Sequence, residues 1–260
     1  MNFLEEILSR KRLEVAERRV HTPDAQLEAK MTEGGAGRLW SALSGPGGPT
    51  RIIAEVKRAS PSLGVIRQDL GAAQTARHYA RAGAAAISVL TDGPGFGGSP
   101  QDLKDARAAV DVPLLRKDFV VDRYQLLEAK AWGADAALLI VAALERAALE
   151  SLLRDCAQVG LDALVEVHDE TELEVALAAG ARVVGVNNRN LKTFQVDLAT
   201  SERLIPRIPA DVRAVAESGI RGQDEVRRLR GAGAVNFLVG EALVRAADSE
   251  ALLRDLARLQ

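Results

Sequence analysis

The chain has 260 residues, enough for one large domain or two small ones. Apolar residues make up 47% of it and charged residues 27%, a balance typical of a globular protein with a hydrophobic core. The 34 basic and 36 acidic side chains leave a net charge of −2, so we expect no nucleic-acid or membrane partner. The lone cysteine and three scattered histidines offer neither an internal disulfide nor a zinc spacing. We therefore expect a cytoplasmic protein without a metal or other cofactor.

Residues 1–48 are predicted to form a helical extension. Their mixture of glutamates and arginines fits neither a transit peptide nor a secretory signal, and no apolar run approaches the length of a membrane span. The segment 44–50, rich in glycine and proline, separates the extension from the rest of the chain. We expect the extension to pack over the mouth of a single domain that spans 1–260. Its apolar helix face comprises Phe3, Leu4, Ile7, Leu8 and Val15.

Eight short apolar runs come after this segment, separated by longer stretches of helical period. They are apolar on both faces, as expected of parallel strands buried on each side. The runs span 51–57, 85–90, 112–117, 135–141, 162–167, 182–187, 212–217 and 235–240.

Four of the intervening helices are each followed directly by glycine, the residue that commonly caps a helix. These helices span 72–82, 122–132, 169–179 and 223–230, with Asp122, Asp169 and the weaker Gln223 at three of their starts. Residues 49–260 divide into eight units of about 26 residues, the size of a βα unit in a (β/α)8 barrel. A doubly wound open sheet would normally carry a glycine-rich fingerprint after its first strand, which this chain lacks. We predict an α/β fold of the (β/α)8, or TIM-barrel, type.

Polar and ionisable residues gather where these strands end, the edge at which barrel active sites lie. Glu55 and Lys57 are two residues apart on the first strand and so point to the same side. Structural ion pairs across the mouth are the alternative interpretation, but so many charges at one rim are costly unless they are used. The other members are Lys117, Asp118, Glu166, Asn187, Asn188, Arg189, Glu217 and Ser218.

Lysine is scarce, with seven among the 34 basic residues, so a lysine at a strand end indicates a need for a property that arginine lacks. Lys130, on a predicted helix face, is expected to tolerate arginine. His168 has no partner pattern, and Cys156 falls inside a predicted helix. We interpret both as structural.

A phosphate site is expected at the loops after the last two strands, as in many barrels. Glycines there let backbone N–H groups approach an anion, and a helix begins directly afterwards. Tight turns alone are the alternative explanation for these glycines. The candidate residues are Ser218, Gly219, Gly240 and Glu241, with Ser60 and Ser62 from the loop after the first strand.

The same residues carry a resemblance to a known family. The strings IIAEVKRASPSLGVIR (52–67), LLRKDF (114–119), LVEVHDETEL (164–173), VGVNNRNLKTF (184–194) and AESGI (216–220) resemble indole-3-glycerol phosphate synthase. SVLTD (88–92) and FLVGEALVR (237–245) fit as well, so the resemblance covers nearly the whole chain. It implies closure of the indole ring of 1-(2-carboxyphenylamino)-1-deoxyribulose 5-phosphate, with loss of carbon dioxide and water, in tryptophan biosynthesis.

The resemblance also implies roles for individual residues. Lys117 would be the general acid toward the ribulose carbonyl, Lys57 would hold the substrate carboxylate, and Glu166 would act in dehydration. Orientation of the site would fall to Glu55, Asn187, Arg189 and Glu217. The phosphate would be held by Ser60, Ser218, Gly219, Gly240 and Glu241, and the anthranilate ring by Phe96, Phe119 and Leu191.

Two departures and two rival interpretations accompany the resemblance. Gly93, Pro94 and Gly95 stand in a loop that is usually more aromatic, and Ala242 stands where relatives often have a hydroxyl. A sibling barrel similar to phosphoribosylanthranilate isomerase would lack the extension and the paired lysines, and a non-catalytic scaffold would be expected to lose Lys117 or Glu166. The expected partner is a small phosphorylated substrate, and other tryptophan-pathway enzymes are candidate partners.

Overall fold

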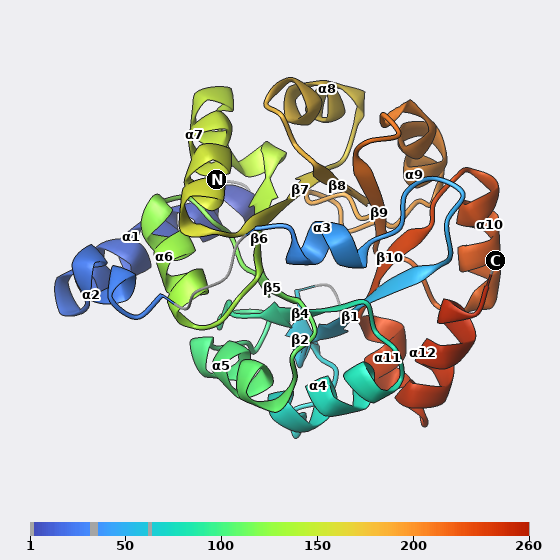
Figure 1. The fold of residues 1–260 in the computed structure, drawn as a ribbon, viewed down its shortest axis with the longest axis horizontal. Coiled ribbons are helices and arrows are strands. Elements are labelled where there is room, and N and C mark those ends of the chain that lie inside the picture. Colours follow the sequence, from blue (N-terminus) through green and yellow to red (C-terminus); the bar gives the residue numbers. More distant parts are fainter. Residues whose placement is uncertain (1–2, 32–35, 62–63, 260) are drawn as a thin grey trace.

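The computed structural model describes residues 3–31, 36–61 and 64–259. Eight parallel strands close into a barrel in the order β1-β10-β9-β8-β7-β6-β5-β4 (Figure 1), which confirms the predicted (β/α)8 fold. The barrel strands are β1 (Arg51–Val56), β4 (Ala86–Leu90), β5 (Leu114–Lys117), β6 (Ala136–Ile140), β7 (Asp162–Val167), β8 (Val183–Asn187), β9 (Arg213–Glu217) and β10 (Asn236–Val239).

Helices surround this barrel and bury its outer face. They are α4 (Ala72–Arg81), α5 (Pro100–Ala109), α6 (Arg123–Ala131), α7 (Arg146–Val159), α8 (Glu170–Ala178), α9 (Ala199–Leu204), α10 (Gln223–Gly231), α11 (Glu241–Arg245) and α12 (Ser249–Ala257), with short 3-10 turns at Val141–Ala143 and Ile205–Arg207.

The caps of the surrounding helices mostly follow the prediction. Asp122 and Asp169 each accept a backbone N–H at the start of their helices, from Tyr124 and Glu172. The prediction was wrong for α10. Its N-cap is Gly222 rather than Gln223, and the helix includes Gly231, so the left-handed residue is Gly233 with φ of 94°.

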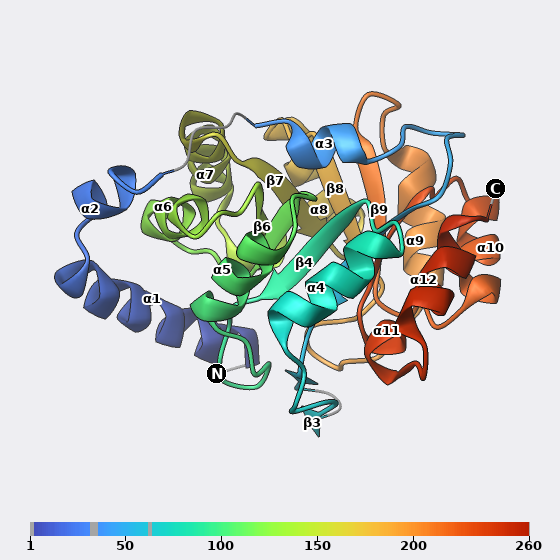
Figure 2. The ribbon, with the colours of Figure 1, turned by 60° about the horizontal axis from the view of Figure 1, so that its bottom comes forward.

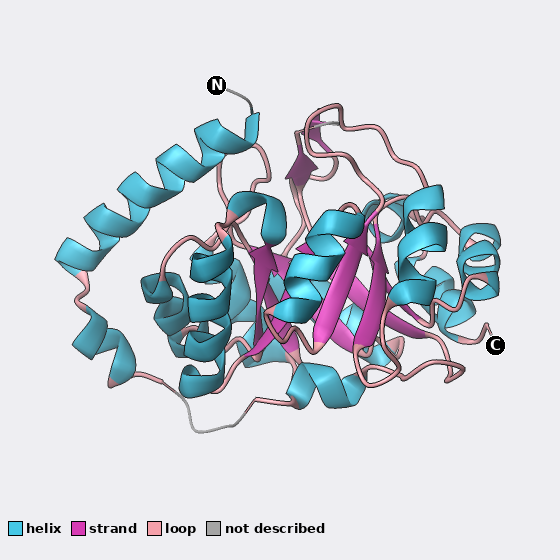
Figure 3. Ribbon diagram, turned by 90° about the horizontal axis from the view of Figure 1, so that it is seen from above, coloured by secondary structure: helices cyan, strands magenta, loops and turns pink. Residues whose placement is uncertain are grey.

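The N-terminal extension divides between the two ends of the barrel. It comprises α1 (Phe3–His21), α2 (Asp24–Glu28) and α3 (Arg38–Ala42). Figures 2 and 3 place the start of α1 at the end where the strands finish and α3 across the opposite end. The prediction that the whole extension covers the mouth was therefore wrong for α3.

Helix α3 closes the amino-terminal end of the barrel. Leu39 is fully buried and packs with the apolar side chains that fill the barrel interior. Asp162, at the start of β7, accepts the backbone N–H groups of Gly37, Leu39 and Trp40 at 2.7, 2.8 and 3.1 Å. One carboxylate thus satisfies three donors that a helix start leaves without intrahelical partners. Removing the extension would expose this end of the barrel as well as the mouth.

Helix α1 is held to the other end by a buried lysine. Lys11 Nζ lies 2.7 Å from Asp92 Oδ1 and 2.9 Å from Asp118 Oδ1, and its side chain is 1% exposed. The two aspartates follow β4 and β5, so this contact fixes α1 beside the strand that carries Lys117.

A small hairpin that the sequence analysis did not foresee stands on the rim. It pairs β2 (Ala59–Ser60) with β3 (Gly64–Val65) in antiparallel register. Arg58, at its base, forms a two-pronged contact of 2.7 and 2.8 Å with the carboxylate of Asp102 at the start of α5. The loop after β1 is thereby tied to the loop after β4.

Candidate active site

The carboxyl ends of the strands open into a cavity of about 550 Å³. Alternate residues of each strand face the barrel axis, so the last inward residue of several strands reaches this space. The residues to which the resemblance gave roles all line this one cavity, namely Glu55, Lys57, Ser60, Phe96, Lys117, Phe119, Glu166, Asn187, Arg189, Leu191, Glu217, Ser218, Gly219, Gly240 and Glu241. Asp118, also expected at this rim, lines it too, whereas Asn188 is not among the lining residues. Ser62 lies outside the described residues.

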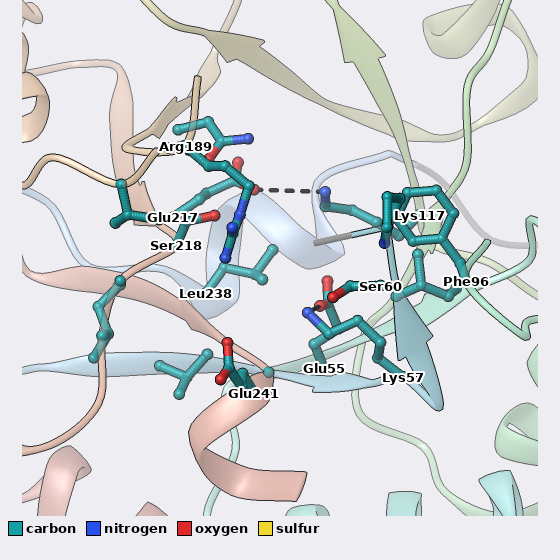
Figure 4. A pocket seen from close by; sticks show the side chains of 18 of the residues that line it. Glu55, Lys57, Ser60, Phe96, Lys117, Arg189, Glu217, Ser218, Leu238 and Glu241 are labelled. Atoms are coloured by element: carbon teal, nitrogen blue, oxygen red, sulfur yellow. Dashed lines mark hydrogen bonds and ion pairs between the residues drawn. The ribbon is translucent and has the colours of Figure 1, made fainter. Parts of the chain in front are cut away.

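Lys117, at the end of β5, directs its ammonium group toward two carboxylates. Its Nζ lies 3.4 Å from Glu166 Oε2 on β7. It lies 3.7 Å from Glu217 Oε2 on β9 (Figure 4). Glu166 and Glu217 are almost fully buried, at 1% and 2% exposure. One cation and two acids therefore form a single electrostatic unit inside the barrel.

Burial and mutual charge set the protonation of this unit. Burial alone would lower the pKa of Lys117, but Glu166, Glu217 and Glu55 together raise it above its ordinary value. Burial raises the pKa of Glu217, and the nearby carboxylates add to this against the opposing charge of Lys117. For Glu166, burial is outweighed by Lys117, His168 and Asn187, so the pKa is lowered. Two neighbouring acids with pKa values displaced in opposite directions are typical of acid/base sites.

Two glycines, Gly185 on β8 and Gly240 directly after β10, leave room for the buried carboxylates. A Cβ at Gly185 would lie 2.0 Å from Glu217 Oε1, and one at Gly240 would lie 2.6 Å from Glu55 Oε1. Glu55 in turn pairs with Lys57, whose Nζ lies 2.8 Å from its Oε1. Side-chain packing, rather than a turn of the backbone, explains glycine at position 185.

His168 follows β7 and lies between two glutamates. Its Nε2 is 3.3 Å from Glu166 Oε1 and its Nδ1 is 2.9 Å from Glu172 Oε2 on α8. Burial would lower the pKa of the imidazole, but the two carboxylates raise it to about 10. The purely structural interpretation of His168 missed this contact. Its signal was present in the sequence, because glutamates stand two residues before and four residues after the histidine.

The loops after β9 and β10 form another side of the cavity. Ser218 and Gly219 both adopt left-handed backbone conformations, with φ of 63° and 80°. Such a conformation is uncommon for a residue with a side chain, and Asn188 supports it by donating from Nδ2 to the Ser218 carbonyl at 3.1 Å. Helix α11 begins at Glu241, whose carboxylate pairs with Arg245 Nε at 3.2 Å. An anion in the cavity would therefore be bound by the backbone N–H of Glu241 and not by its side chain.

Aromatic rings supply the apolar wall. Phe96 and Phe119 lie with ring centroids 5.9 Å apart, and Leu191 lines the same space. The extension adds a second pair, because Phe3 meets Phe194 edge to face at 5.1 Å. Phe3 was expected on the apolar face of the first helix, but no pattern in the sequence singled out Phe194.

Neither a metal-binding cluster nor a membrane-spanning helix is evident in the part of the chain that the structure describes. Within 3–31, 36–61 and 64–259, no three His, Cys, Asp or Glu side chains lie close enough together to hold a metal ion. Among the same residues, no helix combines the length and apolar character needed to cross a bilayer.

A (β/α)8 barrel with acidic and basic groups at the carboxyl ends of its strands defines this protein as a barrel enzyme. The family model for indole-3-glycerol phosphate synthase matches residues 4–256. The chain belongs to that family, whose members are carboxy-lyases of tryptophan biosynthesis.

Curated relatives named indole-3-glycerol phosphate synthase match over almost their full length. The protein from Desulfosudis oleivorans is 46% identical over 98% of both chains. The protein from Syntrophobacter fumaroxidans is 49% identical over 98% of this chain and 97% of its own. Solved structures at lower identity share the fold alone. A 3-hexulose-6-phosphate synthase superposes with a TM-score of 0.62 at 18% identity, over 80% of this chain and 98% of that one.

Proposed function

We propose that this chain closes the indole ring of 1-(2-carboxyphenylamino)-1-deoxyribulose 5-phosphate to give indole-3-glycerol phosphate, carbon dioxide and water. The observation that carries the proposal is the placement of Lys117 between two buried carboxylates, in a cavity that Lys57 also enters. Family membership supports the reaction, and the cavity supplies the groups that it needs. These are an acid for a carbonyl oxygen, a cation for a carboxylate and a second acid/base group.

Lys117 is proposed as the general acid of ring closure. As the ring carbon that bears the carboxylate attacks the ribulose C2 carbonyl, Lys117 Nζ gives its proton to the carbonyl oxygen. Because its pKa is raised, Lys117 is protonated at neutral pH. Loss of the carboxylate as carbon dioxide leaves its bonding electron pair on the ring and restores aromaticity.

Glu166 is proposed as the acid/base group of dehydration. The hydroxyl created by ring closure leaves as water when it receives a proton, and a proton leaves the neighbouring carbon as the indole double bond forms. Glu166 is ionised at rest, since Lys117 lowers its pKa. Once Lys117 has given up its proton, this effect is lost, and Glu166 becomes a better proton acceptor.

The remaining residues are proposed to position the substrate. Lys57, 2.8 Å from Glu55, is placed to meet the carboxylate of the anthranilate ring. Phe96, Phe119 and Leu191 would pack against that ring. Asn187, Arg189 and Glu217 would orient the ribulose chain. The phosphate would bind to backbone and hydroxyl donors of Ser60, Ser218, Gly219, Gly240 and Glu241.

A continuous assay tests this proposal directly. Purified protein mixed with the carboxyphenylamino substrate, without added cofactor, should produce the fluorescence of an indole product, with release of one carbon dioxide per indole. Absence of both signals from folded protein would refute the proposed function. Conversion of N-phosphoribosylanthranilate instead would support the sibling isomerase.

We also propose where in the cell the reaction takes place and which proteins associate with this one. A cytoplasmic location is supported by the free thiol of Cys156, which is buried and suits a reducing compartment. Enzymes that make the substrate or use the product are proposed partners. Fractionation of the native cells and crosslinking of this protein in them would test both statements.

A further inference from the structure

The proposed reaction consumes one proton from solution in each turnover. Ring closure takes a proton for the carbonyl oxygen, and dehydration takes one for the leaving hydroxyl but releases one from carbon. Carbon dioxide leaves from an ionised carboxylate without supplying a proton. The balance is one substrate carboxylate plus one proton giving indole product, carbon dioxide and water, so Lys117 must be recharged from outside the cavity.

A line of titratable groups runs from the protein surface to Lys117. Glu172, on α8, has a side chain that is 20% exposed, and its Oε2 lies 2.9 Å from His168 Nδ1. His168 Nε2 lies 3.3 Å from Glu166 Oε1, and Glu166 Oε2 lies 3.4 Å from Lys117 Nζ. Side-chain exposure falls along this line to 13% at His168 and 2% at Glu166, and Lys117 itself is 16% exposed, toward the cavity that the substrate would fill during turnover. The gap to Glu172 is a hydrogen bond, whereas His168 Nε2 has no hydrogen-bond partner among the described residues, so the ring and the Lys117 side chain must each move slightly toward Glu166 to come within about 3.2 Å, the reach of a proton transfer.

We propose that Glu172, His168 and Glu166 form a relay that returns a proton from solvent to Lys117 after each turnover. The inference rests on the proposed function of Lys117 as the acid of ring closure. In each cycle the imidazolium gives its Nε2 proton to Glu166 Oε1, the carboxyl group turns about its Cγ–Cδ bond, and the same proton passes to the neutral amine of Lys117. The neutral imidazole still carries its Nδ1 proton, so the ring turns about its Cβ–Cγ bond, takes a proton at Nε2 from water or Glu172 at the partly exposed end, and turns back. His168 acts through Glu166 and not on the substrate, so it is a positioning and proton-supplying residue.

The groups that face His168 keep it charged between turnovers. Glu166 from β7 and Glu172 from α8 contact the ring directly, and Glu217 from β9 and Lys117 from β5 lie beyond Glu166. The net effect raises the pKa of His168 to about 10 despite burial. A protonated ring is therefore available at neutral pH and is lost as the pH rises through this value.

The backbone also holds the relay in position. The His168 N–H donates to Glu172 Oε2 at 2.8 Å, so one carboxylate oxygen receives both the backbone and the ring of the histidine. Asp169 accepts the Glu172 N–H at 2.9 Å and fixes the start of α8. A glutamine at position 172 would keep an acceptor for the His168 N–H but could not carry a proton.

The test compares His168→Asn and Glu172→Gln with the unaltered protein, with His21→Asn as the matched control because His21 is exposed. We expect His168→Asn to lower kcat by about tenfold or more, within the range of general acid–base contributions, with little change in KM. Glu172→Gln should have a smaller effect in the same direction, and His21→Asn none. Melting temperatures show whether each variant is folded.

Imidazole supplies the decisive readout. At fixed pH and ionic strength, rising imidazole concentration should restore kcat of His168→Asn and leave the unaltered protein unchanged, because the buffer replaces the missing proton donor. The kcat ratio of the two proteins should also approach one as the pH rises past the pKa of His168, about 10. Unchanged kcat in His168→Asn, or a loss that imidazole does not rescue in folded protein, would overturn the relay. If the unaltered protein forms no indole product, the proposed function itself fails.

Discussion

At the scale of single residues, Lys117 is the sharpest test of the proposed chemistry. Arginine keeps the positive charge, but its guanidinium does not lose a proton in the useful pH range, and its planar shape differs from that of an ammonium. We expect Lys117→Arg to lower kcat by at least about a hundredfold, the low end for a lost general acid. The melting temperature should change little. Steady-state kinetics and thermal unfolding measure the two effects.

The matched control for this substitution has to be chosen from the structure. The sequence suggested Lys130, but this residue is only 5% exposed and its Nζ donates to the Gly160 carbonyl at 3.1 Å. The expectation that it tolerates arginine was therefore poorly founded. Lys30 is exposed, so Lys30→Arg should leave turnover unchanged. Near-normal turnover in Lys117→Arg would show that Lys117 is an electrostatic anchor and not the acid.

Gly185 offers a test of site geometry without removal of any polar group. In Gly185→Ala the new methyl group would meet Glu217 Oε1 and force this carboxylate away from its position near Lys117. We expect kcat to fall at least about tenfold because misplacement of a catalytic group by about an ångström is costly. Gly231→Ala, on a helix where a Cβ meets no neighbour, is the control. A fully active Gly185→Ala would imply that the position of Glu217 is unimportant.

A site residue could be predicted where an ionisable side chain falls at the end of a predicted strand. Lysines and glutamates at strand ends meet both conditions, and closure of the barrel brings the strand ends together whatever rotamers these side chains adopt. Phe194 escaped prediction because its contact with Phe3 depends on where α1 docks. The contacts of His168 were not predicted, although its two partners, Glu166 and Glu172, stand close to it in the sequence.

At the scale of elements, the attachment of α1 depends on one buried cation. Burial raises the pKa of Asp92, and Lys11 opposes that rise, whereas Arg116 and Lys11 outweigh burial and lower the pKa of Asp118. Lys11→Met would leave the two carboxylates facing each other. We expect a loss of about 3 kcal/mol, the low end for removing one partner of a buried ion pair, because Arg10 and Arg116 remain. Chemical denaturation measures this loss.

The pH dependence of that loss has a definite sign. Without Lys11 the pKa of Asp92 rises further above its value in the unfolded chain. Protonated Asp92 is then favoured in the folded state over the unfolded state, so the free energy of unfolding of the variant falls as the pH rises and Asp92 loses this proton. Destabilisation by Lys11→Met should therefore be smaller at mildly acidic pH than at neutral pH, and Lys30→Met should show neither effect. A loss that does not vary with pH would exclude charge repulsion as its cause.

The two helices of the extension with the clearest roles differ in how far sequence could place them. An amphipathic face predicts that α1 docks somewhere on the body of the protein. The sequence does not say which end of the barrel α3 covers, because its partner Asp162 is 125 residues from Gly37. The hairpin of β2 and β3 has only two residues in each strand, too few for a periodic signal.

At the scale of the whole molecule, an anion should stabilise the fold through the expected phosphate site. A ligand that binds the native state alone adds about 2.7 kcal/mol at a hundredfold excess over its Kd. We expect inorganic phosphate or sulfate to raise the melting temperature, and sodium chloride at matched ionic strength to raise it less. Crystals soaked in sulfate should show the anion beside Ser218, Gly219 and Gly240. An anion bound elsewhere, with this rim empty, would contradict the assignment.

The barrel itself was predictable because its signals are local and repeated. Each strand is a short run buried on both faces, and most of the helices between strands are marked at their ends by a glycine or an aspartate. Closure of the barrel then results from the number of units. Exact helix ends were harder to predict. At the end of α10, either Gly231 or Gly233 could adopt the left-handed conformation that ends a helix, and the structure places it at Gly233.

The division of the extension between the two barrel ends has a consequence for how the protein is made. A ribosome releases α1 and α3 before the barrel strands, yet the residues that hold these helices are produced much later. The ion pair of Lys11 with Asp118 cannot form until Asp118 has been synthesised, and the hydrogen bonds of Gly37 and Leu39 cannot form until Asp162 has been. Short helices such as α3 are marginal in water without tertiary contacts. The extension therefore emerges before the barrel but docks on it late, and a nascent chain halted before residue 162 would leave α3 undocked while the early strands are already present.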